Sequence, residues 1–330
     1  MRPNPRRLAL VVSPLVPLLA LAALTAFGPG ADGAFIIRSR LVGGMGYVHL
    51  QDVAAYYGMQ AMSDGRALTM AGSGQRLDLT LNSRSGYVNG YLVDLGFSPV
   101  EDNGSLLLAE RDLALQLDPI LRPWGLPRHS LRTIVIDPGH GGHDPGALGR
   151  VTEEKNIVLN VGLRLKRLLE SRGYAVVMTR DHDEFIDLDA RGRFRGDLFV
   201  SLHCNSSDSP NPDGIETYFL PPAGLPKTGD NAVARGGLPG NRFDGLNVRL
   251  AYDLHCYAVY HAQQFADRGL KRARFQVLRQ ATCPAALVEM GFISNAAEEQ
   301  RLINPEFQEA LAVGLANGII SYHGIVAGAR

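Results

Sequence analysis

The order of apolar and polar positions divides the chain into two differently patterned regions. Between residues 35 and 117 the apolar segments are short, and Leu77, Leu79 and Leu81 alternate with polar residues. A period of two is typical of a strand with one buried face. The other signals here are a strand-like segment at 47–50, a helix at 52–57 ended by Gly58, and tight turns at Gly72, Gly74, Gly86 and Gly90. This pattern predicts a small α+β accessory domain over residues 35–117.

In residues 132–325, β-branched apolar segments alternate with longer helical ones. Ile157, Val161, Leu165 and Leu168 fall on one face of a helix predicted at 155–172. The remaining expected elements are strands at 133–136, 175–179, 198–202 and 285–288, and helices at 246–265 and 305–322. Strands alternating with helices predict an α/β domain, with a mainly parallel, twisted sheet covered by helices on both faces.

The stretch between the two regions, residues 118–131, contains Pro119, Pro123, Gly125 and Pro127. Repeated proline and glycine between patterned segments indicate a linker.

The first 34 residues have the layout of a secretory signal. Arg2, Arg6 and Arg7 precede an apolar run from residue 8 to 27, and small residues follow up to Ala34. This order predicts export to the periplasm or cell envelope, with membrane contact only through this segment. The alternative is an uncleaved membrane anchor, because the run approaches the length that crosses a bilayer, although prolines interrupt it.

Charge and cysteine content narrow the possible partners. The chain has 33 basic and 33 acidic residues, so it offers no field for a polyanion and predicts no nucleic-acid partner. Three cysteines, Cys204, Cys256 and Cys283, define no disulfide framework. One pair in an oxidising compartment and small buried apolar side chains both remain open.

Polar side chains follow three of the predicted strands in the second region. His140 follows the first within Asp137-Pro138-Gly139-His140, while His203 and Glu289 each follow another strand, and Glu154 lies just before the first helix. The carboxyl ends of strands line the ligand crevice of an open α/β sheet, so these side chains can converge. Two histidines and a carboxylate can bind zinc and leave a fourth position for water, and a second carboxylate can take that water's proton. A structural, hydrogen-bonded role for each histidine is the alternative.

Six stretches of the second region, in this order, resemble the zinc-dependent N-acetylmuramoyl-L-alanine amidases of type 3: TIVIDPGHGGHDPGALG, EEKN, DLFVSLHCN, GIETYFL, DRGLKRARFQVLR and LVEMGFISNAAEEQRL. The resemblance spans residues 132 to 324. It implies Zn²⁺ held by His140, Glu154 and His203, with Glu289 as the catalytic glutamate. Glu153 is the competing choice for the middle ligand, but the family places the glutamate directly before the lysine.

The resemblance further implies hydrolysis of the amide between N-acetylmuramic acid and L-alanine in peptidoglycan, during wall remodelling or daughter-cell separation. It leaves open whether an activator protein is needed. Asp137 is expected to orient a ligand histidine. Asn205 and Arg268 are expected to contact either substrate or a salt-bridge partner.

Three stretches of the first region, YVHLQDVAAYYGM, YVNGYLVDLGF and SLLLAERDL, loosely resemble the copper-amine-oxidase-like N-terminal domain, an accessory module of exported bacterial proteins. No copper site is implied, because His49 is a lone histidine.

Two other functions compete with an amidase. A zinc carboxypeptidase-like enzyme would use a similar ligand set, but its close His-x-x-Glu pair is absent. A catalytically degenerate protein that binds peptidoglycan or acts as a scaffold is disfavoured, because His140, Glu154, His203 and Glu289 are all retained.

Overall fold

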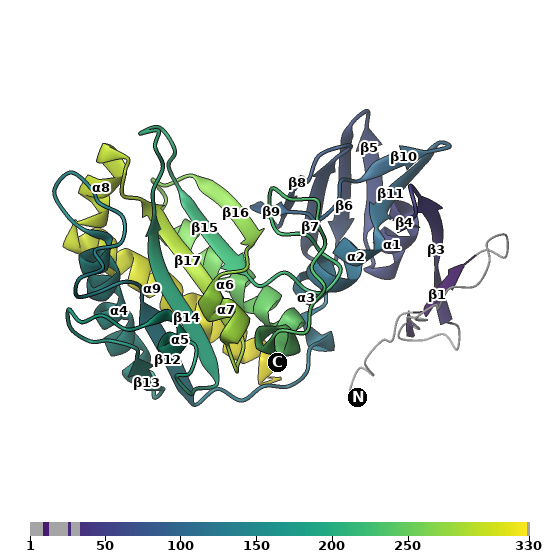
Figure 1. Ribbon diagram of the computed structural model, residues 1–330. Helices are drawn as coiled ribbons and strands as arrows, with labels where there is room; N and C mark the ends of the chain where they lie inside the picture. The colour runs from purple at the N-terminus through teal and green to yellow at the C-terminus, as the bar shows by residue number, and fades with distance from the viewer. Residues whose placement is uncertain (1–8, 13–25, 28–33, 329–330) are drawn as a thin grey trace. The chain divides into compact units, whose positions relative to one another are not determined.

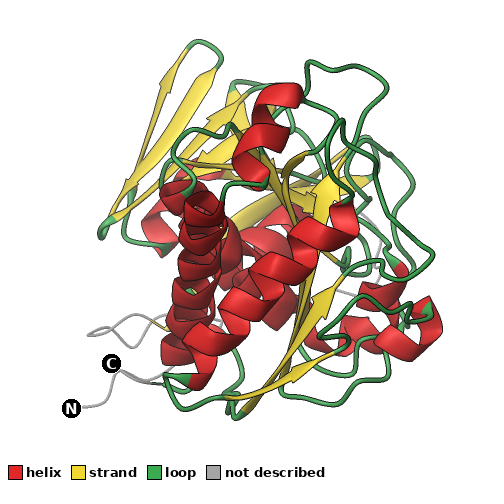
Figure 2. Ribbon diagram, turned by 90° about the vertical axis from the view of Figure 1, so that its left-hand side faces the viewer, coloured by secondary structure: helices red, strands yellow, loops and turns green. Residues whose placement is uncertain are grey.

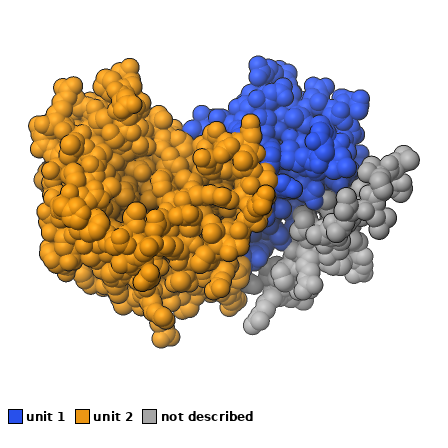
Figure 3. Space-filling view, in the orientation of Figure 1, with its two compact units in different colours: residues 1–126 blue, residues 127–330 orange. Residues whose placement is uncertain are grey.

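The computed structural model describes residues 9–12, 26–27 and 34–328, so most of the predicted signal segment lies outside the described residues. The chain divides into two compact units, residues 1–126 and 127–330, which Figure 3 colours separately. Within the described ranges no helix is long and apolar enough to cross a membrane.

The first unit contains two groups of strands and a few short helices (Figure 1). Strands β5 to β9 form an antiparallel meander, and the second group has the order β1-β3-β4-β11-β10, with β2 paired to β3. The strands are β1 (Ala9–Val12), β2 (Ala26–Phe27), β3 (Ala34–Val42), β4 (Met45–His49), β5 (Gln60–Asp64), β6 (Ala67–Gly72), β7 (Gln75–Thr80), β8 (Ser85–Val88), β9 (Tyr91–Asp94), β10 (Val100–Asp102) and β11 (Ser105–Ala109). The helices are α1 (Leu50–Tyr56), α2 (Glu110–Asp112), a π-helical turn at Leu113–Leu117, α3 (Asp118–Leu121) and a 3-10 turn at Pro123–Gly125.

The alternating pattern in this unit predicts β7 correctly, since Leu77 and Leu79 are buried on one face of that strand. One of the expected turns is wrong. Gly86 lies inside β8, where an added Cβ would come 2.7 Å from Leu79 Cδ2, so this glycine admits a cross-strand neighbour.

The stretch expected as a linker starts as part of the first unit. Asp118 begins α3, Ile120 and Leu121 are buried, and Arg122 pairs with Asp118 at 2.8 Å. The boundary between the units falls after Leu126. The prolines of this stretch permit a helix because Pro119 occupies its first turn, where no backbone donor is needed.

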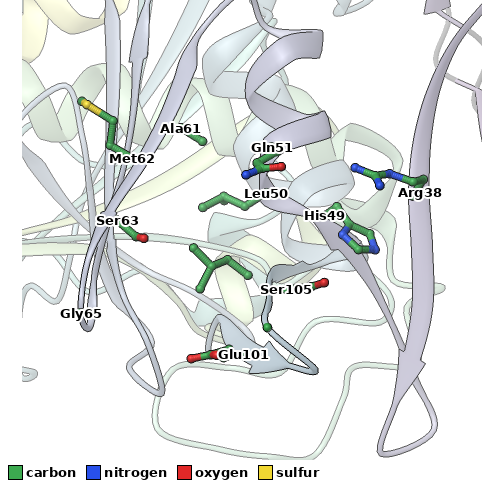
Figure 4. Close-up of a pocket in the computed structure, with 12 residues that line it drawn as sticks. Arg38, His49, Leu50, Gln51, Ala61, Met62, Ser63, Gly65, Glu101 and Ser105 are labelled. Carbon is green, nitrogen blue, oxygen red and sulfur yellow. The ribbon is translucent and has the colours of Figure 1, made fainter.

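A pocket of about 480 Å³ opens in the first unit (Figure 4). Arg38, His49, Gln51, Met62 and Glu101 are among its lining residues. Arg38 is engaged by Asp52 at 2.8 Å, so the pocket presents no free guanidinium.

The second unit is one sheet between two layers of helices (Figures 1 and 2). Its strand order is β13-β12-β14-β17-β15-β16. The strands are β12 (Thr133–Pro138), β13 (Ala175–Met178), β14 (Leu198–Asn205), β15 (Ile215–Phe219), β16 (Asp267–Arg272) and β17 (Ala285–Phe292). The helices are α4 (Glu154–Glu170), α5 (Leu188–Arg191), a 3-10 turn at Pro239–Phe243, α6 (Asp244–His261), α7 (Gln276–Gln280), α8 (Ala296–Leu302) and α9 (Pro305–Val326).

The expectation of a mainly parallel sheet needs correction, because the sheet is mixed. Strands β13, β12, β14 and β17 are mutually parallel, but β15 runs antiparallel to β17. Segment 206–214, which joins β14 to β15, contains no helix, and a parallel return needs a longer crossover. Helix α6 then supplies that crossover, so β16 is parallel to β15.

The two faces of this sheet carry different helices. Helix α9 contacts both α4 and α6, and α4 and α6 pack on one face of the sheet, where Gly162 lets α4 approach Pro138. On the other face Val135, Phe199 and Leu287 pack with Val277 of α7. Side chains alternate along a strand, so Asp137, Ser201, His203 and Glu289 project from this second face.

Two buried arginines fix the turn that follows β12. Arg191 bonds Asp137 at 2.8 Å and donates to the carbonyls of Pro138 and His140. Arg180 donates to the carbonyls of Pro138, Gly139 and Lys155. Both side chains are at most 2% exposed, so their charges are held by these acceptors rather than by water.

We expect residues 127–330 to fold without the first unit. Strands β12 to β17 and helices α4 to α9 lie in this fragment, and its start is held by the bond from His129 N to Val326 O at 3.0 Å. Circular dichroism should show a cooperative thermal transition. An insoluble fragment beside a soluble full chain would mean that the first unit belongs to the same core.

Replacing Arg191 by alanine should lower the free energy of unfolding by about 3–5 kcal/mol, because Asp137 is left buried and unpaired. The control, Arg167→Ala, removes a 70% exposed arginine and should change that free energy by no more than about 0.5 kcal/mol. Chemical denaturation of the full chain measures both. Equal midpoints for the two variants would contradict the role given to the buried pair.

Candidate metal and catalytic site

The structure brings His140, Glu154 and His203 together. Their ligand-type atoms all lie within 4.8 Å of one another, and the described part of the chain holds no second group of this kind. His140 Nε2 lies 3.2 Å from Glu154 Oε2, and His203 Nδ1 lies 2.9 Å from Glu154 Oε1. The two imidazoles meet edge to face, with centroids 5.0 Å apart. One atom of each residue therefore faces a common point.

Glycines around these side chains provide the space that they occupy. A Cβ on Gly139 would lie 2.2 Å from His203 Cε1, and one on Gly146 would lie 2.6 Å from Glu154 Oε2. His140 itself has φ 59°, a left-handed conformation that non-glycine residues rarely adopt. The turn is thus shaped around the imidazoles rather than by local preference.

Asp144 holds the far side of the first histidine. Its Oδ2 lies 2.8 Å from His140 Nδ1, which leaves Nε2 directed at Glu154. The expectation that Asp137 orients a histidine is wrong. Asp137 accepts bonds from Thr179 and Ser201 and pairs with Arg191, so both of its oxygens are taken by partners other than a histidine. The sequence signal for Asp144 is its place four residues after His140 in the same motif.

Glu154 begins α4 and is bound on both oxygens. Oε2 accepts from Ala147 N at 2.8 Å, and Oε1 accepts from Cys204 N at 2.9 Å. Burial opposes its ionisation, but the bonds with His140 and His203 prevail and hold the pKa of Glu154 far below its usual value. Glu154 is therefore a fixed anion. Glu153, the competing choice, instead pairs with Lys155 at 3.4 Å.

Glu289 lies beside this group on β17, in register with His203 on β14. Its Oε2 is buried and has no hydrogen-bond partner among the described residues. Burial raises the pKa of Glu289 to about 7, although nearby His203 opposes the shift. A carboxylate poised near neutrality, with an unused oxygen, can accept a proton.

The charge balance of the site favours a cation. Burial disfavours a charged His203, yet Glu154 overrides this and raises the pKa of His203 to about 9; the pKa of His140 is also raised, mainly through Glu154 against burial. The carboxylates therefore attract positive charge to the point that the two imidazoles face. Two imidazole nitrogens and one carboxylate oxygen, from His140, His203 and Glu154, suit a divalent metal with nitrogen and oxygen ligands.

A further buried carboxylate, Glu216, was missed by the sequence interpretation. It lies directly opposite Glu289 in the antiparallel pairing of β15 with β17, and it is 3% exposed. Arg268 and Lys271 bond one of its oxygens at 2.7 and 2.6 Å, while Asn205 and Tyr218 donate to the other. Asn205 and Arg268 thus share Glu216 as a partner. The signal lay in the GIETYFL stretch, but nothing in one sequence shows that its glutamate is paired with Glu289.

The other histidines and the cysteines have structural surroundings. His143 stacks on Phe185 with centroids 4.2 Å apart, and buried His255 bonds Thr217 and Asp267. The three cysteines are free, and burial raises the pKa of Cys283 to about 12. They form no reactive group.

The second unit, which holds this site, is similar to known proteins. The family model described as N-acetylmuramoyl-L-alanine amidase matches residues 134–321. A sporulation-specific N-acetylmuramoyl-L-alanine amidase of Bacillus subtilis is 34% identical over 192 residues, covering 56% of this chain and 66% of that protein. The amidase AmiC of Neisseria meningitidis serogroup B is 34% identical over 241 residues, covering 64% and 57%.

Among solved structures, the catalytic domain of CwlV, an N-acetylmuramoyl-L-alanine amidase from Bacillus (Paenibacillus) polymyxa, is similar with a TM-score of 0.50 and 33% identity, over 59% of this chain and 99% of that one. The chain spans between 57% and 66% of the length of the first two curated relatives. The family match covers more than half of the chain and includes His140, Glu154, His203 and Glu289. The chain belongs to the N-acetylmuramoyl-L-alanine amidase family.

Proposed function

We propose that this protein is a zinc-dependent hydrolase of peptidoglycan that cleaves the amide between N-acetylmuramic acid and L-alanine. The observation that carries the proposal is the convergence of His140, Glu154 and His203 beside Glu289, inside the segment that matches the amidase family. An arrangement that only binds wall polymer needs neither a clustered ligand set nor a carboxylate with a raised pKa.

His140 would hold the metal through Nε2, His203 through Nδ1, and Glu154 through a carboxylate oxygen. Two histidines and one carboxylate are a common zinc set that leaves a position open. When bound, zinc supplies Lewis-acid polarisation of the amide carbonyl and lowers the pKa of water. Asp144 keeps the His140 ring in its orientation by accepting from Nδ1.

Glu289 acts as the general base. Its raised pKa lets it take a proton from the attacking water near neutral pH and return that proton to the leaving amine of L-alanine. The paired strands β14 and β17 hold it beside His203. The group that accepts the proton and a residue that would hold the metal therefore lie at the same rigid edge of the sheet.

The proposal extends to the other regions of the chain. Residues 1–34 would export the chain to the periplasm or cell envelope, where it remodels the wall or separates daughter cells. Residues 35–117 would serve as an accessory module similar to the copper-amine-oxidase-like N-terminal domain.

Glu289→Gln should retain close to one zinc per chain while kcat on peptidoglycan falls by about 100- to 10,000-fold, because glutamine keeps the shape but accepts no proton. His140→Ala and His203→Ala should lose metal and activity together. Metal analysis and release of peptide from purified sacculi measure the two properties.

The matched control is Glu153→Gln, which alters an exposed carboxylate one position from Glu154 and should keep both metal and activity. If Glu289→Gln remained fully active with zinc bound, Glu289 would not be the general base. Loss of zinc in Glu289→Gln with retention in Glu154→Ala would reverse the two roles.

Asp144→Asn should weaken zinc affinity by about 10- to 100-fold, since the bond that fixes the His140 ring loses its charge. Asp181→Asn, which alters a 69% exposed aspartate paired only with exposed His182, is the control and should leave affinity unchanged. Competition with a chelator gives both dissociation constants. Equal affinities would show that Asp144 does not orient the ligand.

A further inference from the structure

A cationic cluster lies next to the proposed base. Buried Glu216 takes Arg268 Nε at 2.7 Å and Lys271 Nζ at 2.6 Å on the same oxygen. One negative and two positive charges leave a net charge of +1 at this point. The side chains of Arg268 and Lys271 are 34% and 18% exposed, so the excess charge is open to a ligand.

Arg268 has unused donors. Only its Nε bonds Glu216, its guanidinium lies 4.9 Å from the ring of Phe292, and neither terminal nitrogen has an acceptor among the described residues. A guanidinium carries five N–H donors in a planar fork that suits carboxylates. Stacking on Phe292 and the bond to Glu216 hold this fork in place, so little freedom is lost on binding.

The strand register places the cluster beside the site. Glu216 is the direct partner of Glu289, and Arg268 stands near the start of β16, which runs parallel to β15. Asn205, two residues beyond His203, also contacts Glu216. A substrate held at Glu289 therefore lies next to these cations.

We propose that Arg268 and Lys271 form a subsite for a carboxylate of the peptide stem, with Glu216 as their positioning residue. This inference rests on the proposed function. Once the lactyl carboxyl of muramic acid is in the amide bond, the N-acetylated sugars carry no anion, whereas acidic residues and the C-terminus of the peptide do. The cluster thus receives the peptide side of the scissile bond and not the glycan.

Glu216 holds the two cations of this subsite in place. Two cations sharing one oxygen would repel each other without it, and its buried negative charge keeps both at a defined place. Burial favours neutral Glu216, but Lys271, Tyr218 and Arg268 together lower its pKa, so the anion persists at neutral pH.

The test compares two soluble substrates: a disaccharide bearing L-Ala-D-Glu with both carboxyls free, and the same compound with both as carboxamides. For the zinc-loaded full chain, KM should be about 10-fold lower for the dicarboxylate, the size of a charged hydrogen bond. Arg268→Gln and Lys271→Met should each remove most of that difference by raising KM for the dicarboxylate alone, with kcat and zinc content nearly unchanged. Arg167→Gln, which removes an exposed charge from α4, should preserve it.

Equal KM values for the two substrates in the wild-type enzyme would overturn the subsite, and so would an Arg268→Gln variant that loses affinity for both alike. Should Arg268→Gln fail to fold, Lys271→Met and the wild-type comparison still decide. If the wild-type enzyme cleaved neither substrate, this result would instead contradict the proposed function. Calorimetric binding of the free dipeptide L-Ala-D-Glu against its diamide then tests the subsite alone, with tighter binding of the dipeptide expected.

Discussion

The site depends on the buried pairing of Asp137 with Arg191. A charge in the sheet interior is tolerated only with a partner, and here the partner also binds the main chain beyond the strand. Arg180, which lies in the same β13–β14 connection as Arg191, also donates to the carbonyls of this turn. The position of His140 is thus set by side chains that never reach the reacting atoms, and the chemistry relies on a rigid polar core beneath it.

This arrangement explains why a left-handed histidine persists. The conformation of His140 costs about 1–3 kcal/mol and needs surroundings that over-determine it. Bonds to three successive carbonyls, at Pro138, Gly139 and His140, provide that constraint. Because Gly139 carries no side chain, His203 can also pack directly onto the turn. The arginines therefore hold the strained backbone of the turn, while Asp144 separately orients the His140 ring.

Much of the second unit could be predicted because its signals are local. Apolar runs precede His140, His203 and Glu289 along the chain, and the rule that the carboxyl ends of parallel strands meet brought these residues together, although His203 and Glu289 lie within β14 and β17 rather than after them. The roles of Asp144 and Glu216 could not be predicted, because they depend on which atom a side chain reaches and on which strands pair. The direction of β15 escaped for a related reason, since helical periodicity says nothing about a connection that lacks a helix. Gly86 looked like a turn residue, but cross-strand packing explains it.

The antiparallel direction of β15 affects how such a fold can diversify. Strands β15 and β16 with α6 between them form a continuous block of sequence, and their first residues meet the ends of β12, β14 and β17 at one rim. The clustered histidines and Glu289 come from β14, β17 and the turn after β12. Substitutions confined to residues 215–272 can change the side chains at this rim while His140, Glu154, His203 and Glu289 stay the same. Glu216 links the two sets, because its charge adds to the effect of burial in raising the pKa of Glu289.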